Sequence, residues 1–408
     1  MGAFAPREIS YADEATYCEG EVSGFWTWSK RLPALDARPD FVQDRQSDGS
    51  LQTRQNESRP GYLLAKRGSL ELDFLWHGHG TDPTGALVET WLQALLAHGL
   101  GGGDVTEVGG TVGVGSTTTS LVYAAATLVR GGIIRVGQRG DGGGDGEATV
   151  VGTPTASPAT LLTALPAAPS NGHVIRAAQI AYPKETLVTT KRFLYAHTVH
   201  ANSQWVALGC QLAGLTLKSV FGSPPMWTFR YLMGYFGGPA PIVGSVPQVA
   251  TLEDCKAAPM AGATCYYQTV GTATRNLLVP SEVELSLDLG LAEKKGAGAG
   301  AAPHRDIAGY ERTRCVPTLK LRCPWSDEFA TLYDTDGSGT THKHILVMLN
   351  AQAGRSVGFY MPRAYPVGPR PSIDEYNELG YVTVMFRGRE GTDTTNELTR
   401  SPVRFFSA

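Results

Sequence analysis

The feature that most restricts the fold is the segment 209–234, GCQLAGLTLKSVFGSPPMWTFRYLMG, in which two alternating runs flank a Gly-Ser-Pro-Pro turn signal. Large apolar side chains take the odd positions and polar side chains the even ones, a period of two that predicts a two-faced β-hairpin. The apolar set is Leu215, Leu217, Phe221, Trp227, Phe229, Tyr231 and Met233, and the polar set is Thr216, Lys218, Thr228 and Arg230. Burial of the apolar set is worth roughly 10–20 kcal/mol, which an isolated hairpin cannot realise. We therefore expect this face to pack against another layer.

The composition favours turn-rich β-structure over a helical bundle. The chain has 408 residues with 49 glycines and 25 prolines, and 18% of its residues are charged. This length suits two or three domains with a sizeable core. The net charge of −3 argues against a dedicated nucleic-acid binder, because such domains carry a basic excess.

Targeting signals and cysteines give little further direction. The start, MGAFAPREISYADEATY, has no basic segment followed by an apolar core, and no apolar run reaches the ~18–20 residues that span a bilayer. We expect a protein without a membrane partner that stays in the compartment of its synthesis. The six cysteines include no C-x-x-C pair and are expected to be free thiols.

The first half contains an alternating strand, a helix and a β-rich segment. Residues 1–57 are polar and resemble an arm or an extended hairpin. Residues 69–76 place Leu70, Leu72, Phe74 and Trp76 on one face and Glu71 and Asp73 on the other. Asp82 and Pro83 predict a helix start, and Gly99 its end. A β-rich insertion is expected at about 128–185.

The second half repeats this pattern from about residue 250. Residues 282–289 alternate again, with apolar Val283, Leu285, Leu287 and Leu289 opposite Glu282, Glu284 and Asp288. Ser326 can cap a short helix, and two further strands close the chain. We align Glu71 with Glu284 and predict a duplication, with domains at 1–250 and 251–408. The run 291–306, LAEKKGAGAGAAPHRD, has no counterpart and is predicted to be a long loop.

Several motifs resemble sites for chemistry but lack a decisive residue. GTVGVGST at 110–117 has Ser116 where a phosphate-binding loop needs lysine. DTDGSGTTHKHI at 334–345 opens like a calcium loop but ends at Ile345 instead of an acid. The pairs His77/His79 and His342/His344 have no third ligand nearby. We therefore predict no catalytic residues, no metal and no cofactor.

The acids on the two alternating strands have two possible roles. As pairs they could be hydrolytic carboxylates, but a solvated strand face explains them more simply. If several copies surround a central hole, inward-facing acids would make a negatively charged wall that repels DNA.

Three stretches resemble the tail tube proteins of long-tailed bacteriophages. They are ISYADEATY with the later LPALD, SLELDFLWHG followed by ETWLQALLAHGL, and KRFLYAHTVHANSQWVALGCQLAGLTLKSVFGSPPMWTFRYLMGYF. The resemblance covers about the first 240 residues by order and joint occurrence, and the remainder more weakly. It implies a mainly β fold of two tail-tube-like β-sandwich domains, each with a flanking helix, whose strands contribute to an inner β-barrel.

The resemblance also implies a structural role without enzymatic activity. Copies would form rings that stack into the virion's tail tube, assembled in the host cytoplasm, through which DNA passes transiently. Tape measure and tail-end proteins would be partners. Because the chain is about twice the usual length, a trimeric ring of duplicated domains is favoured over a hexamer with an added decoration domain.

The resemblance assigns places to particular residues. Glu71, Asp73, Glu282, Glu284 and Asp288 would face the lumen, and Lys294, Lys295, His304 and Arg305 would lie in an inter-ring loop. The hairpin's polar face, with Lys218 and Arg230, would meet a neighbour or solvent instead of the channel. A polysaccharide hydrolase or a carbohydrate-binding baseplate module is the alternative reading.

Overall fold

The computed structural model shows a mainly β chain with few helices. It describes residues 7–14, 30–32, 36–46, 62–75, 91–103, 109–137, 147–154, 157–185, 190–197, 203–241, 264–295, 307–325, 342–349, 357–368, 373–376, 379–393 and 395–407. The domain boundary predicted near residue 250 and the helix predicted after Ser326 lie outside these residues. No helix in the described ranges is both long and apolar enough to cross a bilayer.

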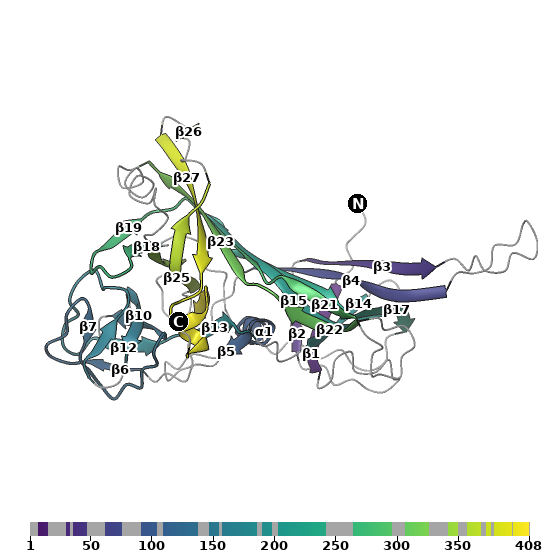
Figure 1. Cartoon of the computed structure of the whole chain (residues 1–408), viewed down its shortest axis with the longest axis horizontal. Coiled ribbons are helices and arrows are strands. Elements are labelled where there is room, and N and C mark those ends of the chain that lie inside the picture. Colours follow the sequence, from purple (N-terminus) through teal and green to yellow (C-terminus); the bar gives the residue numbers. More distant parts are fainter. Residues whose placement is uncertain are drawn as a thin grey trace, which may run out of the picture.

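An antiparallel ladder of eight strands forms the centre of the molecule (Figure 1). In spatial order the strands are β3 (Asp36–Gln46), β4 (Tyr62–Leu75), β16 (Met226–Met233), β15 (Ser203–Val220), β20 (Glu282–Asp288), β23 (Val316–Pro324), β27 (Leu379–Arg389) and β26 (Ile373–Tyr376). The order joins strands from both halves of the sequence, because β15 pairs directly with β20.

A second layer covers the apolar face of this ladder. Its strands follow the order β5 (Gly101–Gly103), β13 (Gln179–Pro183), β28 (Arg404–Ser407), β25 (Val357–Pro366) and β24 (Lys343–Met348). Because β25 also pairs with β27, the sheet curls over its own core and becomes nearly closed and barrel-like. The helix α1 (Trp91–Leu100) contributes Leu95, Leu96 and Leu100 to the core.

The core row that crosses the ladder shows why the alternation predicted the strands correctly. Directly opposite one another, and all buried, lie Phe74, Trp227, Leu217, Leu285, Leu319 and Phe386. Directly paired residues in antiparallel strands share a face, so one period of two per strand adds up to one continuous apolar surface. A single hydrophobic cluster includes residues from both halves of the chain.

The opening hairpin is present as β15 and β16, with one exception to its predicted packing. Leu215, Leu217, Trp227, Phe229, Tyr231 and Met233 are buried, whereas Phe221 is 72% exposed. The prediction for Phe221 was wrong because β15 ends at Val220 and the chain turns there. Alternation no longer directs side chains to a face once the strand has ended.

The helix α1 ends after Gly99, whereas the sequence predicted that Gly99 ends it. α1 runs through Gly99 to Leu100 and leads directly into β5, while Asp82 and Pro83 lie outside the described residues. An added Cβ at Gly99 would approach Leu212 to 2.8 Å, so glycine here permits close packing of the helix on β15 instead of ending it.

A separate seven-stranded sheet forms a body with its own core. It consists of β7 (Ser120–Leu121), β11 (Ala159–Leu161), β10 (Glu147–Thr153), β9 (Ile133–Gly137), β12 (Val174–Ala177), β6 (Gly110–Val112) and β8 (Tyr123–Ala124). The hairpin of β18 (Thr264–Thr269) and β19 (Arg275–Leu278) holds it to the main body. Arg275 lies over the Tyr266 ring and donates to the carbonyls of Ala148 and Ala164. Figure 1 places this body at the opposite end from the β3–β4 hairpin.

The remaining strands of the large sheet join the ladder through the first part of β15. β15 is long and bent, with an irregular register between Leu212 and Gly214. Its first part pairs with β14 (Thr190–His197) and β17 (Tyr235–Pro241), and β14 pairs with β1 (Arg7–Glu14), which pairs with β2 (Lys30–Leu32). Together with the long β3–β4 hairpin, these strands give the N-terminal region more regular structure than its polar composition suggests.

Candidate assembly surface

The eight-stranded ladder has two edges without a further strand among the described residues. β3 pairs only with β4, and β26 pairs only with β27. Every neighbouring pair is antiparallel, so the first and last of the eight strands run in opposite directions. Two copies placed head to tail would therefore bring β26 of one copy beside β3 of the next in antiparallel orientation. Strands at the edge of a sheet are templates for pairing with another chain.

The face of the ladder opposite the core is polar and carries all five acids predicted to line a lumen. Glu71 and Asp73 lie on β4, and Glu282, Glu284 and Asp288 lie on β20, each alternating with buried neighbours. Lys218 is directly opposite Glu284, and Arg230 is directly opposite Glu71. The contrast drawn between the hairpin's polar face and the acidic strand was therefore wrong, because both belong to one surface.

Each of these five acids lies close to a basic side chain. Arg38 is 2.7 Å from Asp73 and 3.5 Å from Glu71. Lys218 is 3.3 Å from Glu282, Lys320 is 4.0 Å from Glu284, and Arg314 is 2.6 Å from Asp288. Further bases on the same face are Arg230, Arg322 and Arg387. The expected negatively charged wall is thus a surface of mixed sign, in which exposed pairs each contribute little stability.

Two hydrogen bonds fix the carboxylate of Asp288 at the end of β20. Burial by itself would raise its pKa, but hydrogen bonds from the Gly290 N–H and from Arg314 hold the pKa of Asp288 below its usual value. Gly290 has a positive φ of 50°, which lets the chain turn out of β20 directly after the acid. Asp288 therefore marks the end of the ladder strand as well as contributing charge.

A row of small hydroxyl side chains crosses the centre of the same face. Thr228, Thr216, Ser286 and Thr318 are directly opposite one another on β16, β15, β20 and β23. Asp73 precedes this row on β4, where it accepts a 2.6 Å hydrogen bond from Thr228. The centre of the face is consequently neutral and hydrophilic, with charges above and below it.

The predicted inter-ring loop proves to be partly a hairpin. β21 (Leu291–Lys295) pairs with β22 (Ile307–Arg312), so Lys294 and Lys295 belong to a strand and not to a loop. Lys294 is exposed and 3.4 Å from Glu311. His304 and Arg305 lie outside the described residues. The prediction of an open loop from residue 291 was wrong because the pattern of charged residues there does not distinguish an exposed hairpin from a coil.

The other sequence motifs that resembled sites for chemistry are the two loop-like motifs and the two histidine pairs. Ser116 accepts from the Val122 N–H and donates to the Gly113 carbonyl, which makes GTVGVGST a turn between strands. The calcium-like segment and His77 and His79 fall outside the described residues, apart from the last residues of DTDGSGTTHKHI. Among described residues, no three His, Cys, Asp or Glu side chains converge on a metal position.

His342 and His344 contact different partners instead of converging on a metal. His344 is buried, stacks on the Tyr360 ring and lies 2.7 Å from the Tyr360 hydroxyl through Nδ1. Burial, together with nearby Arg404, lowers the pKa of His344 to about 4. His342 makes an edge contact with Tyr365.

The lowered pKa of His344 predicts acid sensitivity. Unfolding returns the imidazole to its ordinary pKa near 6.5, so the unfolded state binds more protons as pH falls from about 6.5 towards 4. We expect the free energy of unfolding to fall by about 2–3 kcal/mol over this range through this one group. Urea denaturation at pH 7 and pH 4.5 measures it, and His344→Gln should reduce the difference. An unchanged pH dependence in that variant would contradict this role.

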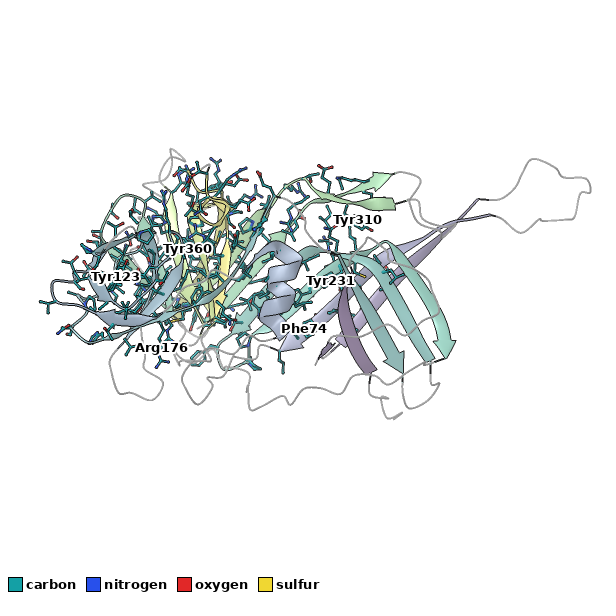
Figure 2. The ribbon with its side chains drawn as sticks, turned by 90° about the horizontal axis from the view of Figure 1, so that it is seen from below. Phe74, Tyr123, Arg176, Tyr231, Tyr310 and Tyr360 are labelled. Carbon is teal, nitrogen blue, oxygen red and sulfur yellow. The ribbon has the colours of Figure 1, made fainter. Side chains whose placement is uncertain are left out.

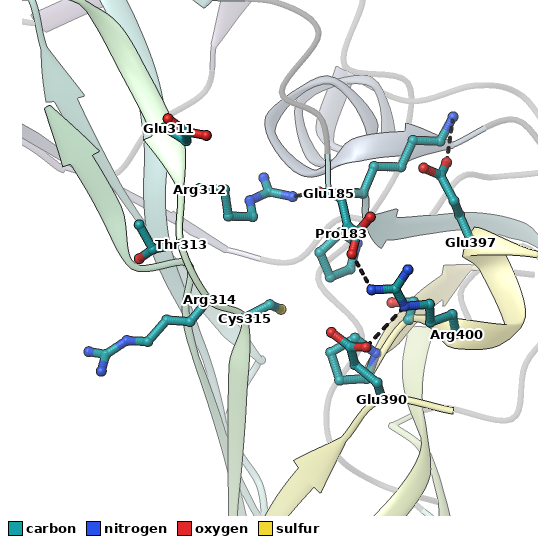
Figure 3. Close-up of a pocket in the computed structure, with 13 residues that line it drawn as sticks. Pro183, Glu185, Glu311, Arg312, Thr313, Arg314, Cys315, Glu390, Glu397 and Arg400 are labelled. Atoms are coloured by element: carbon teal, nitrogen blue, oxygen red, sulfur yellow. Dashed lines mark hydrogen bonds and ion pairs between the residues drawn. The ribbon is translucent and has the colours of Figure 1, made fainter. Parts of the chain in front are cut away.

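One open cleft of about 320 Å³ lies where β13, β22, β27 and α3 (Glu397–Arg400) meet (Figure 3). Arg400 bridges Glu185 and Glu390, and Lys184 pairs with Glu397. Arg312 donates to the carbonyls of Leu100 and Lys184, so it ties the end of α1 to β22. The charged groups of the cleft thus join separate elements, an arrangement that explains them without catalysis.

Several basic residues of the polar face, among them Arg38, Lys320 and Arg322, were not singled out from the sequence. Lys320 and Arg322 alternate with Leu319 and Leu321 in TLKLRC, so the same period that identified the acids could have identified them. Arg38 had no such signal, because its position opposite Glu71 depends on the register between β3 and β4.

Comparison with known proteins adds a weak structural similarity. No protein-family model and no curated protein matches the sequence. Among solved structures, a chain of the anti-feeding prophage baseplate, determined by cryo-electron microscopy with sixfold symmetrisation, is 13% identical. The match covers 35% of this chain and 92% of that chain, with a TM-score of 0.24. A score this low does not indicate a shared fold, so we argue function from the sequence and geometry of this chain alone.

Proposed function

We propose that this chain is a structural virion protein whose copies close into rings and stack to form the hollow tail tube of a long-tailed bacteriophage. The observation that carries the proposal is the eight-stranded antiparallel ladder, whose two outer strands have no further strand beside them among the described residues. Ring closure would pair β26 of each copy with β3 of the next and remove both edges. Tape measure and tail-end proteins would meet the completed tube, which is assembled in the host cytoplasm.

The strand order supports a duplicated chain. In the first half the ladder order is β3, β4, β16, β15, which is first, second, fourth and third along the chain. In the second half it is β20, β23, β27, β26, which is again first, second, fourth and third. The strand equivalent to β4 is then β23 and not β20, so Glu71 corresponds to Lys320 instead of Glu284. LELDFLW at 70–76 and LKLRCPW at 319–325 share the spacing L-x-L-x-x-x-W.

The outer layer supports the same duplication. β5 and β13 of the first half flank β28 on one side, and β25 and β24 of the second half flank it on the other. The strand β28 therefore lies where the two repeats meet. A shared strand of this kind explains why one core serves both halves.

The contact between the repeats supplies a template for the contact between copies. β15, the last ladder strand of the first repeat, pairs with β20, the first of the second repeat. By the same rule β26 would pair with β3 of a neighbouring copy. Three copies would then repeat the contact as six similar units, which favours a trimeric ring over a hexamer.

The charge pattern suits a channel wall if the polar face turns inward. DNA binds proteins chiefly through basic groups that displace its counterions. Here Lys218, Lys320 and Arg38 are already paired with acids, and the central row is uncharged. The wall would therefore bind passing DNA weakly.

Negative-stain electron microscopy of the purified protein, with rotational averaging, tests the proposal. We expect rings with three copies, and tubes at high protein concentration. Sixfold rings of six chains would support the arrangement in which the second half is an added domain. Monomers at every concentration and ionic strength would contradict ring formation altogether.

A further inference from the structure

Six exposed apolar side chains lie at one end of the ladder. We call Val220, Phe221, Met226, Leu277, Val279 and Trp325 the apolar rim. Phe221 is 72% exposed, Val279 64%, and Leu277 51%. Of the ten large apolar residues that the structure describes as exposed, only Val114, Leu162, Val270 and Met385 lie elsewhere. Single exposed apolar residues are ordinary, but a concentration at one place marks an interaction site.

Backbone hydrogen bonds hold the rim at one level of the sheet. The Phe221 N–H donates to the Ser281 carbonyl at 2.9 Å, and the Ser281 N–H donates to the Arg322 carbonyl at 2.7 Å. The Trp325 N–H donates to the Gly380 carbonyl at 2.8 Å. The ends of β15 and β23 and the starts of β20 and β27 therefore form one continuous border. Phe221, Val279 and Trp325 follow one another along it.

The opposite end of the ladder has a different character. There β20 leads through Gly290 into the hairpin β21–β22, and the Tyr310 hydroxyl fixes this hairpin to the Met233 carbonyl at 3.1 Å. Figure 2 shows the hairpin near the Tyr310 label, to one side of the neighbouring strands. Charged pairs, Arg314 with Asp288 and Lys294 with Glu311, surround it. The two ends thus cannot present the same surface to a neighbour.

We propose that the apolar rim is the docking surface for the β21–β22 hairpin of a second copy in the adjacent ring. This inference rests on the proposed ring-forming function. Two unlike ends make a head-to-tail contact, and such a contact propagates without limit along an axis. The segment that joins β21 to β22 contains GAGAGAAP at 296–303, whose small uncharged side chains match an apolar surface. Lys294 and Lys295 precede it, so the charged part of the hairpin would remain outside the contact.

The rim has a direct test with a matched control. The variant Phe221→Ser, Val279→Ser, Trp325→Ser should form rings of unchanged mass, while tubes fall at least tenfold in electron micrographs at equal concentration. The control Val114→Ser, Leu162→Ser, Val270→Ser removes equally exposed residues elsewhere and should form tubes as the unaltered protein does. Tubes of normal length from the rim variant would overturn the inference while leaving ring formation intact. Absence of rings from the unaltered protein would instead overturn the proposed function.

Mixing two variants tests the direction of the contact. Deletion of 296–301 should also leave rings that do not stack. Rings of the rim variant keep an intact hairpin, and rings of the deletion variant keep an intact rim. In a mixture, the hairpin of the first can therefore dock on the rim of the second, but no further ring can be added. We expect stacks of two rings in the mixture, and single rings from either variant alone. A mixture that contains only single rings would contradict docking of the hairpin on the rim.

Discussion

Replacement of Trp227 by alanine should lower the free energy of unfolding by about 3–5 kcal/mol, because it leaves a large cavity in the centre of the core. The Trp227 side chain is fully buried between two layers. Its ring stacks on Phe229 with centroids 5.9 Å apart, and it meets Phe405 of β28 edge-on at 5.5 Å. Since β28 lies between β13 and β25, the loss should loosen the outer layer as well as the hairpin. Urea denaturation measures the effect when it is followed by the circular dichroism of the backbone, because loss of the tryptophan does not remove this signal.

Met226→Ala is the matched control for this substitution. Met226 directly precedes Trp227 on the same strand, but its side chain points to the other face and is 38% exposed. We expect a loss below about 1 kcal/mol, in keeping with surface substitutions. Equal losses in the two variants would mean that the alternation of β16 does not decide which side chains support the core.

Two prolines in β26 should abolish ring closure while leaving the subunit folded. Proline has no N–H and cannot complete a strand ladder. Successive residues of a strand direct their N–H groups to opposite sides, so Asp374→Pro, Glu375→Pro removes an outward donor whichever residue carries it. β26 is an edge strand within the described subunit, so the core row from Phe74 to Phe386 is not touched. Sedimentation velocity should show only monomers.

The double variant Asp374→Ala, Glu375→Ala controls for the loss of two acidic side chains. It keeps both N–H groups, so we expect rings in normal yield. One of the two prolines also removes an N–H that faces β27, so we expect the unfolding midpoint of the proline variant to lie slightly below that of the alanine variant. Rings formed by the proline variant would exclude β26 as the pairing edge, and would move the proposed contact to another surface.

The strands could be predicted from the sequence wherever one face is buried. Leu70, Leu72 and Phe74 alternate with acids, and so do Val283, Leu285 and Leu287, and all six are buried as predicted. Burial of one face imposes a period of two on the sequence of a strand, so the pattern predicts both the strand and its buried residues. Exposed elements impose no such constraint. The β21–β22 hairpin was predicted to be a loop for this reason, and Phe221 was placed in the core although its strand had ended.

The pairing of acids with bases on the polar face could not be predicted from the alternation of apolar and polar residues. A period of two assigns a residue to a face but does not say which strand lies beside it. The partners of Glu284, which are Lys218 on one side and Lys320 on the other, follow from the register of β15, β20 and β23. The mixed charge of the surface therefore emerged only when the strands were paired.

The sequence by itself determined that this chain is mainly β, which residues of its main strands are buried, and that its opening hairpin must pack on another layer. These properties are local, because the free energy of burial acts on each strand's own pattern. Only the tertiary structure decided that both halves form one ladder, whose outer strands are β3 and β26 among the described residues. It also decided that acids and bases share one face, and that the apolar rim lies at one end. Those properties depend on contacts between residues far apart in the sequence, such as Phe221 with Ser281 and Arg38 with Asp73.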